Sequence, residues 1–247
     1  MNIVLLEPGE ANADGEVTLD GDRARHLLSV LKVKPGGQVR SGVLDGPQGR
    51  AEIIAVTRDS VSLRCVFDQP SPPPGQDTLL LGFARPKVLQ RCLEHATALG
   101  FGKIILFRSR RVEKSHLSSH ALLPAAIQER LRRGLEQSRR THRPAVHQVH
   151  RFRQLVEEQL PLLVPLENRF VADGDAPTEA ALASMPPLPL SLVIGPEGGL
   201  IDHELDSFSA HGFALVRAGR EPLRVESALS YLTGQLRAAR TRSNGAD

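Results

Sequence analysis

The sequence predicts a two-part α/β protein in which a small antiparallel β-barrel precedes a mostly parallel α/β domain. Three observations lead to this prediction. Residues 70–75 are rich in proline and cannot continue a helix or a central strand, short strand-like runs precede them, and strands alternating with helices follow them. The chain has 247 residues, 40% of them hydrophobic, and is therefore long enough to bury a core in each part.

The first part, residues 1–69, alternates short apolar runs with Gly, Asp and Pro turns. We expect strands at residues 3–6, 16–19, 38–44, 51–56 and 60–67. One helix, residues 22–32, is predicted between the second and third strands. Its apolar face is formed by residues at helical spacing: Ala24, Leu27, Leu28 and Leu31.

The second part, residues 76–247, is predicted to form a parallel sheet with helical connections. We expect strands at residues 78–83, 103–107, 168–172, 190–194 and 214–217. Helices are expected between Pro86 and Gly100, within residues 119–140, after an N-cap at Asp202, and at residues 225–240. The helix within 119–140 carries one apolar arc, formed by Leu123, Ile127, Leu131 and Leu135.

Positive charge is concentrated in the middle of the chain. Residues 101–150 contain eleven lysines and arginines but three acids, a net charge of +8, and because the whole chain carries +3 the remainder sums to −5. Such a basic segment favours a polyanionic partner, since phosphate binding releases counterions. The run from Glu136 to Pro144 ends the basic helix and includes Arg139, Arg140 and Arg143. The alternative is a solvated surface with structural ion pairs.

Several function classes lack their usual signatures. No apolar run approaches the ~20 residues of a membrane span, and no secretory leader pattern is present, so we expect a soluble, cytoplasmic protein. Cys65 and Cys92 are too few and too far apart for a disulfide framework or a cysteine zinc site, and Cys92 is expected in the core. No metal, P-loop, dinucleotide or nucleophile-elbow motif occurs.

The strongest local signal is the run Ile194-Gly195-Pro196-Glu197-Gly198-Gly199, in which a buried strand enters a glycine-rich turn before a helix. Open α/β sheets bind ligands at the carboxyl ends of their strands, where glycines allow close backbone approach. The alternative is a tight connection that binds nothing.

A second strand end passes through the loop 218–224 into a helix with the apolar stripe Val225, Ala228, Leu229, Leu232 and Leu236. Arg224 and Glu226 lie at the mouth of this helix, and two such loops can form one pocket. The alternative is that Glu226 is a first-turn carboxylate favoured by the helix dipole and Arg224 its surface neighbour.

Four motifs in this order resemble the bacterial 16S ribosomal RNA (uracil-N3)-methyltransferases of the SPOUT class. They are His26 to Lys32, Glu136-Gln137-Ser138 with Arg139 and Pro144, Ile194 to Gly199, and Leu223 to Ala228. The resemblance covers nearly the whole chain and implies a PUA-like barrel (1–69), a linker (70–75) and a SPOUT domain with a deep trefoil knot (76–247). It also implies a homodimer, S-adenosyl-L-methionine as methyl donor, no metal, and the small ribosomal subunit or its 16S rRNA as partner.

Carried over residue by residue, the resemblance implies donor contacts from three loops. These are Ala172 and Asp173; Gly195, Pro196, Glu197, Gly198 and Gly199; and Ala218, Gly219, Leu223, Arg224 and Ser227. RNA contacts are expected from Arg23, His26, Lys32, Arg139, Arg140 and Arg143.

Methylation at uridine N3 requires loss of an imide proton, and our hypothesis gives Arg224 and Glu226 the catalytic roles. Arg224 stabilises the developing anion, and Glu226 orients Arg224 or receives the proton through water. Two other functions stay open: a SPOUT methyltransferase with another RNA target, and a non-catalytic RNA-binding or ribosome-assembly protein.

Overall fold

The computed structural model describes residues 2–176, 185, 186 and 188–243, and the side chains of these residues up to 240. The chain divides into two compact units: Met1–Pro74 with Arg132–Arg143, and Gly75–Leu131 with Pro144–Asp247. The segment 132–143 thus belongs to the unit that begins the chain, which the local sequence pattern does not predict.

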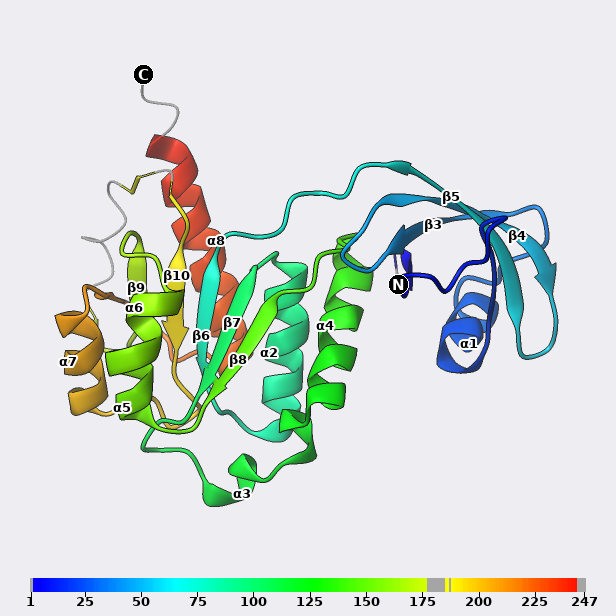
Figure 1. The fold of residues 1–247 in the computed structure, drawn as a ribbon. Coiled ribbons are helices and arrows are strands. Elements are labelled where there is room, and N and C mark those ends of the chain that lie inside the picture. The colour runs from blue at the N-terminus through cyan, green and yellow to red at the C-terminus, as the bar shows by residue number, and fades with distance from the viewer. Residues whose placement is uncertain (1, 177–184, 187, 244–247) are drawn as a thin grey trace. The chain divides into compact units, whose positions relative to one another are not determined.

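The described residues of the first unit form a curled five-stranded sheet in the order β1-β3-β4-β5-β2 (Figure 1). The strands are β1 (Val4–Leu6), β2 (Glu16–Leu19), β3 (Gln38–Val43), β4 (Gln48–Val56) and β5 (Val61–Gln69). Three of the four strand pairings are antiparallel, but β1 runs parallel to β3, so the expected wholly antiparallel barrel is corrected to a mixed sheet.

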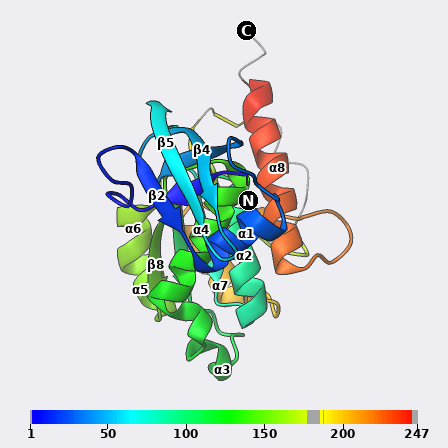
Figure 2. The same ribbon diagram turned by 90° about the vertical axis from the view of Figure 1, so that its right-hand side faces the viewer.

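Helix α1 (Gly21–Ser29) packs on this sheet through Ala24 and Leu27, which are buried with residues of β5 (Figure 2). The helix ends three residues before the expected Lys32. Lys32 adopts a left-handed backbone conformation (φ 49°), and Leu31 is exposed rather than part of the apolar face. The expectation that Leu31 joins the core is therefore wrong.

The segment 132–143 is bonded tightly into the first unit. Leu135 packs in a buried cluster with Ile3, Leu5 and Leu44. The backbone N–H of Asn2 donates to the carbonyl of Glu136 (2.8 Å), and that of Asp45 donates to the carbonyl of Thr141 (2.9 Å). These bonds join residues that lie 134 and 96 positions apart in the sequence.

The second unit is built on a parallel sheet in the order β11-β9-β10-β6-β7-β8. Its strands are β6 (Thr78–Gly82), β7 (Lys103–Phe107), β8 (Ala145–Val149), β9 (Arg169–Ala172), β10 (Ser191–Ile194) and β11 (Ala214–Val216). Five were expected to within two residues at each end. Strand β8 is not predicted from the sequence, because polar His147 and Gln148 break the apolar run of this edge strand.

Helices cover both faces of this sheet (Figure 1). The helical segments are α2 (Pro86–Ala98), α3 (Lys114–Leu117), η1 (His120–Leu122), α4 (Pro124–Ser138), α5 (Phe152–Gln154), η2 (Leu155–Gln159), α6 (Leu160–Leu163), α7 (Asp202–Ala210) and α8 (Val225–Ser243). Alternate strand residues serve the two faces: Leu79 and Leu81 pack with α2 and α8, whereas Leu80 packs with Leu155 and Phe208. Leu123 precedes α4 and is exposed, so its place on the expected apolar arc is wrong. No helix in the described part of the chain is long and apolar enough to cross a membrane.

Asp77, just before β6, ties the sheet to α8. Its carboxylate is 6% exposed and pairs with Arg237 (2.7 Å) and Arg240 (2.8 Å), and it accepts a hydrogen bond from the Leu190 backbone N–H (2.9 Å). Burial alone raises the pKa of Asp77, but the bonds from Leu190, Arg240 and Arg237 outweigh it and hold the pKa below its usual value.

We expect Asp77→Asn to lower the free energy of unfolding at pH 7 by about 2 kcal/mol, because two arginines lose their buried acceptor. A depressed folded-state pKa gives stability that is present above the unfolded-state pKa, near ~4, and is lost as the pH falls through the folded-state value. The difference between the two proteins in urea denaturation should therefore shrink as the pH falls from 7 towards 3. Asp206→Asn, at an exposed carboxylate of α7, is the control, and a difference independent of pH would contradict the assignment.

Cys92 lies in the core on α2, as expected, and is free like Cys65. Burial raises the pKa of Cys92 to about 12, and the nearby carboxylates of Glu226 and Glu197 add to the shift. Burial also raises the pKa of Cys65. Only the thiolate attacks a disulfide reagent, so both cysteines should be inert in the native protein.

At pH 8, a Cys65→Ser protein should show no modification of Cys92 by a disulfide reagent such as dithionitrobenzoate until denaturant is added. The released thionitrobenzoate then reports one thiol per chain. Rapid reaction of the native protein would show that Cys92 is neither as buried nor as protonated as described.

Candidate functional site

A cavity of about 870 Å³ lies in the second unit where several strands end. Its walls come from the loops after β9, β10 and β11, from the start of α8, and from the first turns of α2. Parallel pairing brings these loops together, because the carboxyl ends of parallel strands share one edge of a sheet.

The glycine-rich turn after β10 forms one wall. Gly199 has φ 72°, which favours glycine, and its N–H closes the turn by donating to the Pro196 carbonyl (2.8 Å). The turn packs directly on the end of β6: a Cβ on Gly82 would lie 2.7 Å from Cδ of Pro196. Both positions thus require glycine for this wall to form.

Glu197 is fixed by the backbone at the beginning of α2. Its carboxylate oxygens accept hydrogen bonds from the Arg85 N–H at 3.0 and 3.3 Å. Arg85 is the N-cap of α2, so the negative charge of Glu197 meets the positive end of that helix. Glu197 therefore holds the glycine-rich turn to α2.

The outer side of the same turn is held by the loop after β7. The guanidinium of Arg111 donates to the Gly198 carbonyl (2.8 Å). The Arg110 N–H donates to Oε1 of buried Glu204 (2.8 Å), whose Oε2 accepts from the Ile201 N–H (3.0 Å). The N-cap of α7 is Ile201, not the expected Asp202. No N-cap side chain bonds to this helix; instead the Glu204 carboxylate accepts a hydrogen bond from the Ile201 N–H.

Glu226 and Arg224 both line the cavity. Glu226 is 12% exposed and pairs with Arg91 of α2 (3.3 Å), while its Oε2 is buried and has no hydrogen-bond partner among the described residues. Arg224 is exposed and makes no ion pair within the part of the chain that the structure describes. The acid partner expected to orient Arg224 is thus bonded to Arg91.

Most residues expected to contact a donor line this one cavity. They are Ala172, Asp173, Gly195, Pro196, Glu197, Gly199, Ala218, Gly219, Leu223 and Arg224. Gly198 and Ser227 do not line it: Gly198 faces Arg111, and Ser227 is exposed.

The wall from α2, formed by Arg85, Val88 and Arg91, is not among the residues predicted from the sequence. A signal was present: Pro86 opens a helix directly after a strand, at the same sheet edge as the glycine-rich turn. Among the described residues, no group of three or more His, Cys, Asp or Glu side chains is arranged to hold a metal ion.

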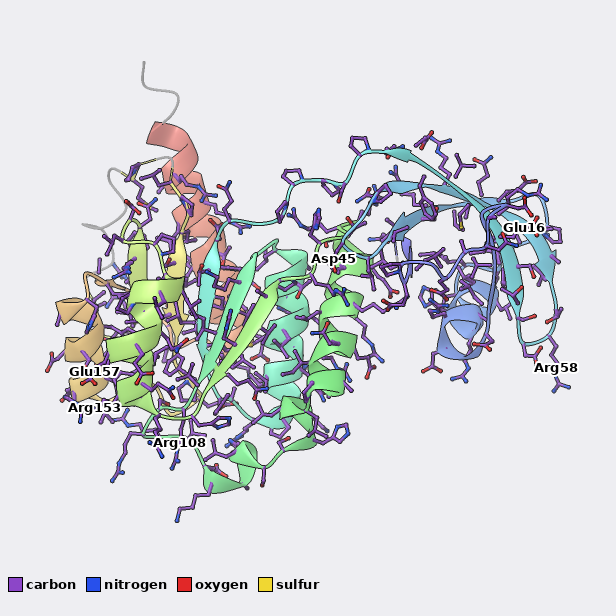
Figure 3. The ribbon with its side chains drawn as sticks, in the orientation of Figure 1. Glu16, Asp45, Arg58, Arg108, Arg153 and Glu157 are labelled. Atoms are coloured by element: carbon purple, nitrogen blue, oxygen red, sulfur yellow. The ribbon has the colours of Figure 1, made fainter. Side chains whose placement is uncertain are left out.

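All six residues expected to contact RNA lie in the first unit, although Lys32 and Arg139 are 107 positions apart in the sequence. Their side chains differ in availability. Arg23 pairs with Glu10, and Arg143 pairs with Asp45 through a 2.8 Å Nε bond (Figure 3 labels Asp45). Arg140 donates to the Pro73 carbonyl (3.2 Å), whereas Lys32 and Arg139 are exposed. Burial lowers the pKa of His26.

Comparison with known proteins identifies the family to which the chain is similar. Residues 71–237 match the family model described as an RNA methyltransferase domain. Ribosomal RNA small subunit methyltransferase E of Treponema pallidum is 30% identical over 92% of this chain and 87% of its own length. The protein of the same name from Bacillus subtilis is 26% identical over 89% of this chain and 91% of its own length.

Solved structures share the fold. A Legionella pneumophila protein in complex with the cofactor SAM has a TM-score of 0.73 at 22% identity, covering 96% of this chain and 97% of that chain. Ribosomal RNA small subunit methyltransferase E of Neisseria gonorrhoeae, bound to S-adenosyl methionine, has a TM-score of 0.68 at 21% identity, covering 99% and 97%.

The expected PUA-like plus SPOUT arrangement is confirmed by these neighbours, while the trefoil knot stays a prediction. The family model covers more than half of the chain, and the Treponema relative aligns over most of both sequences. The chain belongs to the RNA methyltransferase domain family, and within it to the ribosomal RNA small subunit methyltransferases E.

Proposed function

We propose that this protein transfers a methyl group from S-adenosyl-L-methionine to N3 of a uridine in the 16S rRNA of the small ribosomal subunit. The observation that carries the proposal is the single cavity into which the glycine-rich turn and the loop 217–225 bring the family's two C-terminal motifs. Relatives named for small-subunit ribosomal RNA methylation support the substrate class.

The cavity suits a donor of this size and chemistry. Its volume lies within the ~300–1,000 Å³ of small-molecule sites. The close packing of Gly82 on Pro196 and the positive φ of Gly199 fix the backbone of the turn that forms this wall. We infer that the loops carrying Ala172, Gly195, Gly199, Gly219 and Leu223 hold the donor. When bound, S-adenosyl-L-methionine supplies an electrophilic methyl group.

The chain's own residues supply the rest of the chemistry. The uridine N3–H must lose its proton as N3 bonds to carbon. Glu226, whose buried Oε2 has no hydrogen-bond partner among the residues that the structure describes, is the acceptor that we assign. Arg91 fixes the other side of this carboxylate. Arg224, exposed at the cavity and without an ion pair in the described part of the chain, stabilises the negative charge on the carbonyls that flank N3.

The first unit is proposed to hold the RNA. Lys32, Arg139 and Arg143 are the exposed cations of its predicted set; Arg143 is paired with Asp45, and Arg140 is half-buried. Because N3 is on the Watson–Crick edge, the target uridine must be unpaired or extruded to react. A homodimer in the cytoplasm, with a knotted second unit, completes the proposal on the strength of the family resemblance.

The direct test is to incubate the protein with radiolabelled S-adenosyl-L-methionine and small subunits that lack the modification, and then to identify the labelled nucleoside by mass spectrometry. We expect 3-methyluridine. Label in another nucleoside would favour the alternative, a SPOUT methyltransferase with another RNA target. Donor binding in calorimetry without any transfer to rRNA would favour the non-catalytic RNA-binding function.

Substitutions separate the two assigned roles. Arg224→Ala should lower kcat by about 10²–10³-fold, as expected for loss of one group that stabilises a developing anion. Glu226→Gln should lower kcat by about 10²-fold or more and leave donor affinity unchanged in calorimetry. Asp202→Asn, outside the cavity at the start of α7, is the control. A Glu226→Gln protein within a few-fold of the parent would remove Glu226 as proton acceptor.

A further inference from the structure

The arginines of the second unit differ in whether an acid neutralises them. Arg91, Arg130 and Arg153 pair with Glu226, Glu94 and Glu157, and Arg237 and Arg240 share Asp77. In contrast, several exposed arginines make no ion pair with any residue that the structure describes: Arg85, Arg108, Arg110, Arg151, Arg220 and Arg224.

These unpaired arginines share one location, the carboxyl edge of the parallel sheet. Arg220 and Arg224 follow β11, Arg85 follows β6, Arg108 and Arg110 follow β7, and Arg151 follows β8. In the strand order, β6, β7 and β8 are consecutive and β6 is next to β10. With ~4.8 Å between strands, the edge from β10 to β8 extends about 14 Å beyond the glycine-rich turn.

The edge is continuous and its backbone is fixed. The rings of Phe83 and His150, which follow β6 and β8, lie 5.4 Å apart. The Arg108 N–H donates to the Val149 carbonyl (3.0 Å), and the Arg110 N–H donates to Glu204 (2.8 Å). The guanidinium groups are therefore presented from an ordered surface, which reduces the entropy lost when a ligand binds.

Figure 3 shows the contrast at this edge, where Arg153 and Glu157 lie close together and Arg108 stands apart from both. The Nε of Arg153 is 2.8 Å from Glu157, so its charge is already compensated. Unpaired, exposed arginines at neighbouring strand ends repel one another. Arginine is suited to bidentate phosphate contacts, and a row of phosphates relieves this repulsion.

We propose that the RNA strand flanking the target nucleotide leaves the cavity across the ends of β6, β7 and β8, with Arg108, Arg110 and Arg151 binding its phosphates. The identification of the ligand as RNA rests on the proposed function. These residues lie outside the cavity lining and outside the first unit, so they form a second RNA-contact surface.

The test compares Arg108→Gln, Arg110→Gln and Arg151→Gln, singly and combined, with Arg153→Gln as a matched control that removes one already paired charge from the same edge. Binding of a short fluorescein-labelled oligouridine is measured by anisotropy across a salt series. Each lost phosphate contact should reduce the slope of log affinity against log salt by about 0.7. Raising the salt concentration from 50 to 200 mM should therefore weaken RNA binding by the triple variant roughly 20-fold less than it weakens RNA binding by the parent.

Two further measurements distinguish a loss of RNA binding from a loss of donor binding or catalysis. Donor affinity in calorimetry should not change, and methylation of unmodified small subunits should show a raised KM for the subunit with kcat retained. The proposed RNA-contact surface would be wrong if the triple variant had the same slope of log affinity against log salt as the parent, or if Arg153→Gln reduced the slope as much as the other single substitutions do. Failure of the parent protein to methylate any rRNA would instead count against the proposed function. The comparison of RNA binding between the parent and the variants would still test the proposed surface, because it does not depend on methylation.

Discussion

Parallel hydrogen bonding in the order β11-β9-β10-β6-β7-β8 forces all six carboxyl ends of these strands to one edge of the sheet. Helices cover both faces of the sheet, so loops and backbone groups can meet a ligand at this edge, where no helical layer covers them. Residues from 85 to 228 reach one cavity because their strands are neighbours, although they are far apart in sequence. The same constraint sets the unpaired arginines in a row.

The shape of the cavity depends on a turn that is held from three sides. Glu197 bonds the turn to α2, Arg111 holds the Gly198 carbonyl, and β6 supports Pro196 through Gly82. A turn fixed in this way keeps its backbone groups in place before any ligand arrives. Two of these bonds connect the turn with elements that begin more than 80 residues earlier, so the second unit must be folded for the cavity to exist.

Much of this architecture was predictable from local pattern. Strands β7 and β10 are short runs whose last residues are all apolar, next to Gly102 and Gly195, and α8 carries a helical stripe from Val225 to Leu236. Lys32 was misjudged because a helical pattern continues past Ser29, while the backbone turns left-handed at Lys32. The segment 152–163 was missed because Pro161 and a π-helical turn at Leu155–Gln159 obscure its helical period.

The site was predictable where one segment carries it, and not where tertiary structure does. The glycine-rich turn and the loop before α8 each show in a short run of sequence. The bond between Arg91 and Glu226 joins positions 135 residues apart, and no periodicity connects them. The pairing of some edge arginines and not of others is likewise a property of the folded chain alone.

The discontinuity of the first unit sets an order of events during synthesis. Its sheet is complete once residue 69 has been made, but Leu135, which closes the cluster around Leu5, is added only after β6, α2 and β7. In a nascent chain the first unit must therefore stay unfinished until β6, α2 and β7 of the second unit have been made. Transplanting this unit to another protein would require three chain junctions between the two proteins, where a continuous N-terminal unit would need one.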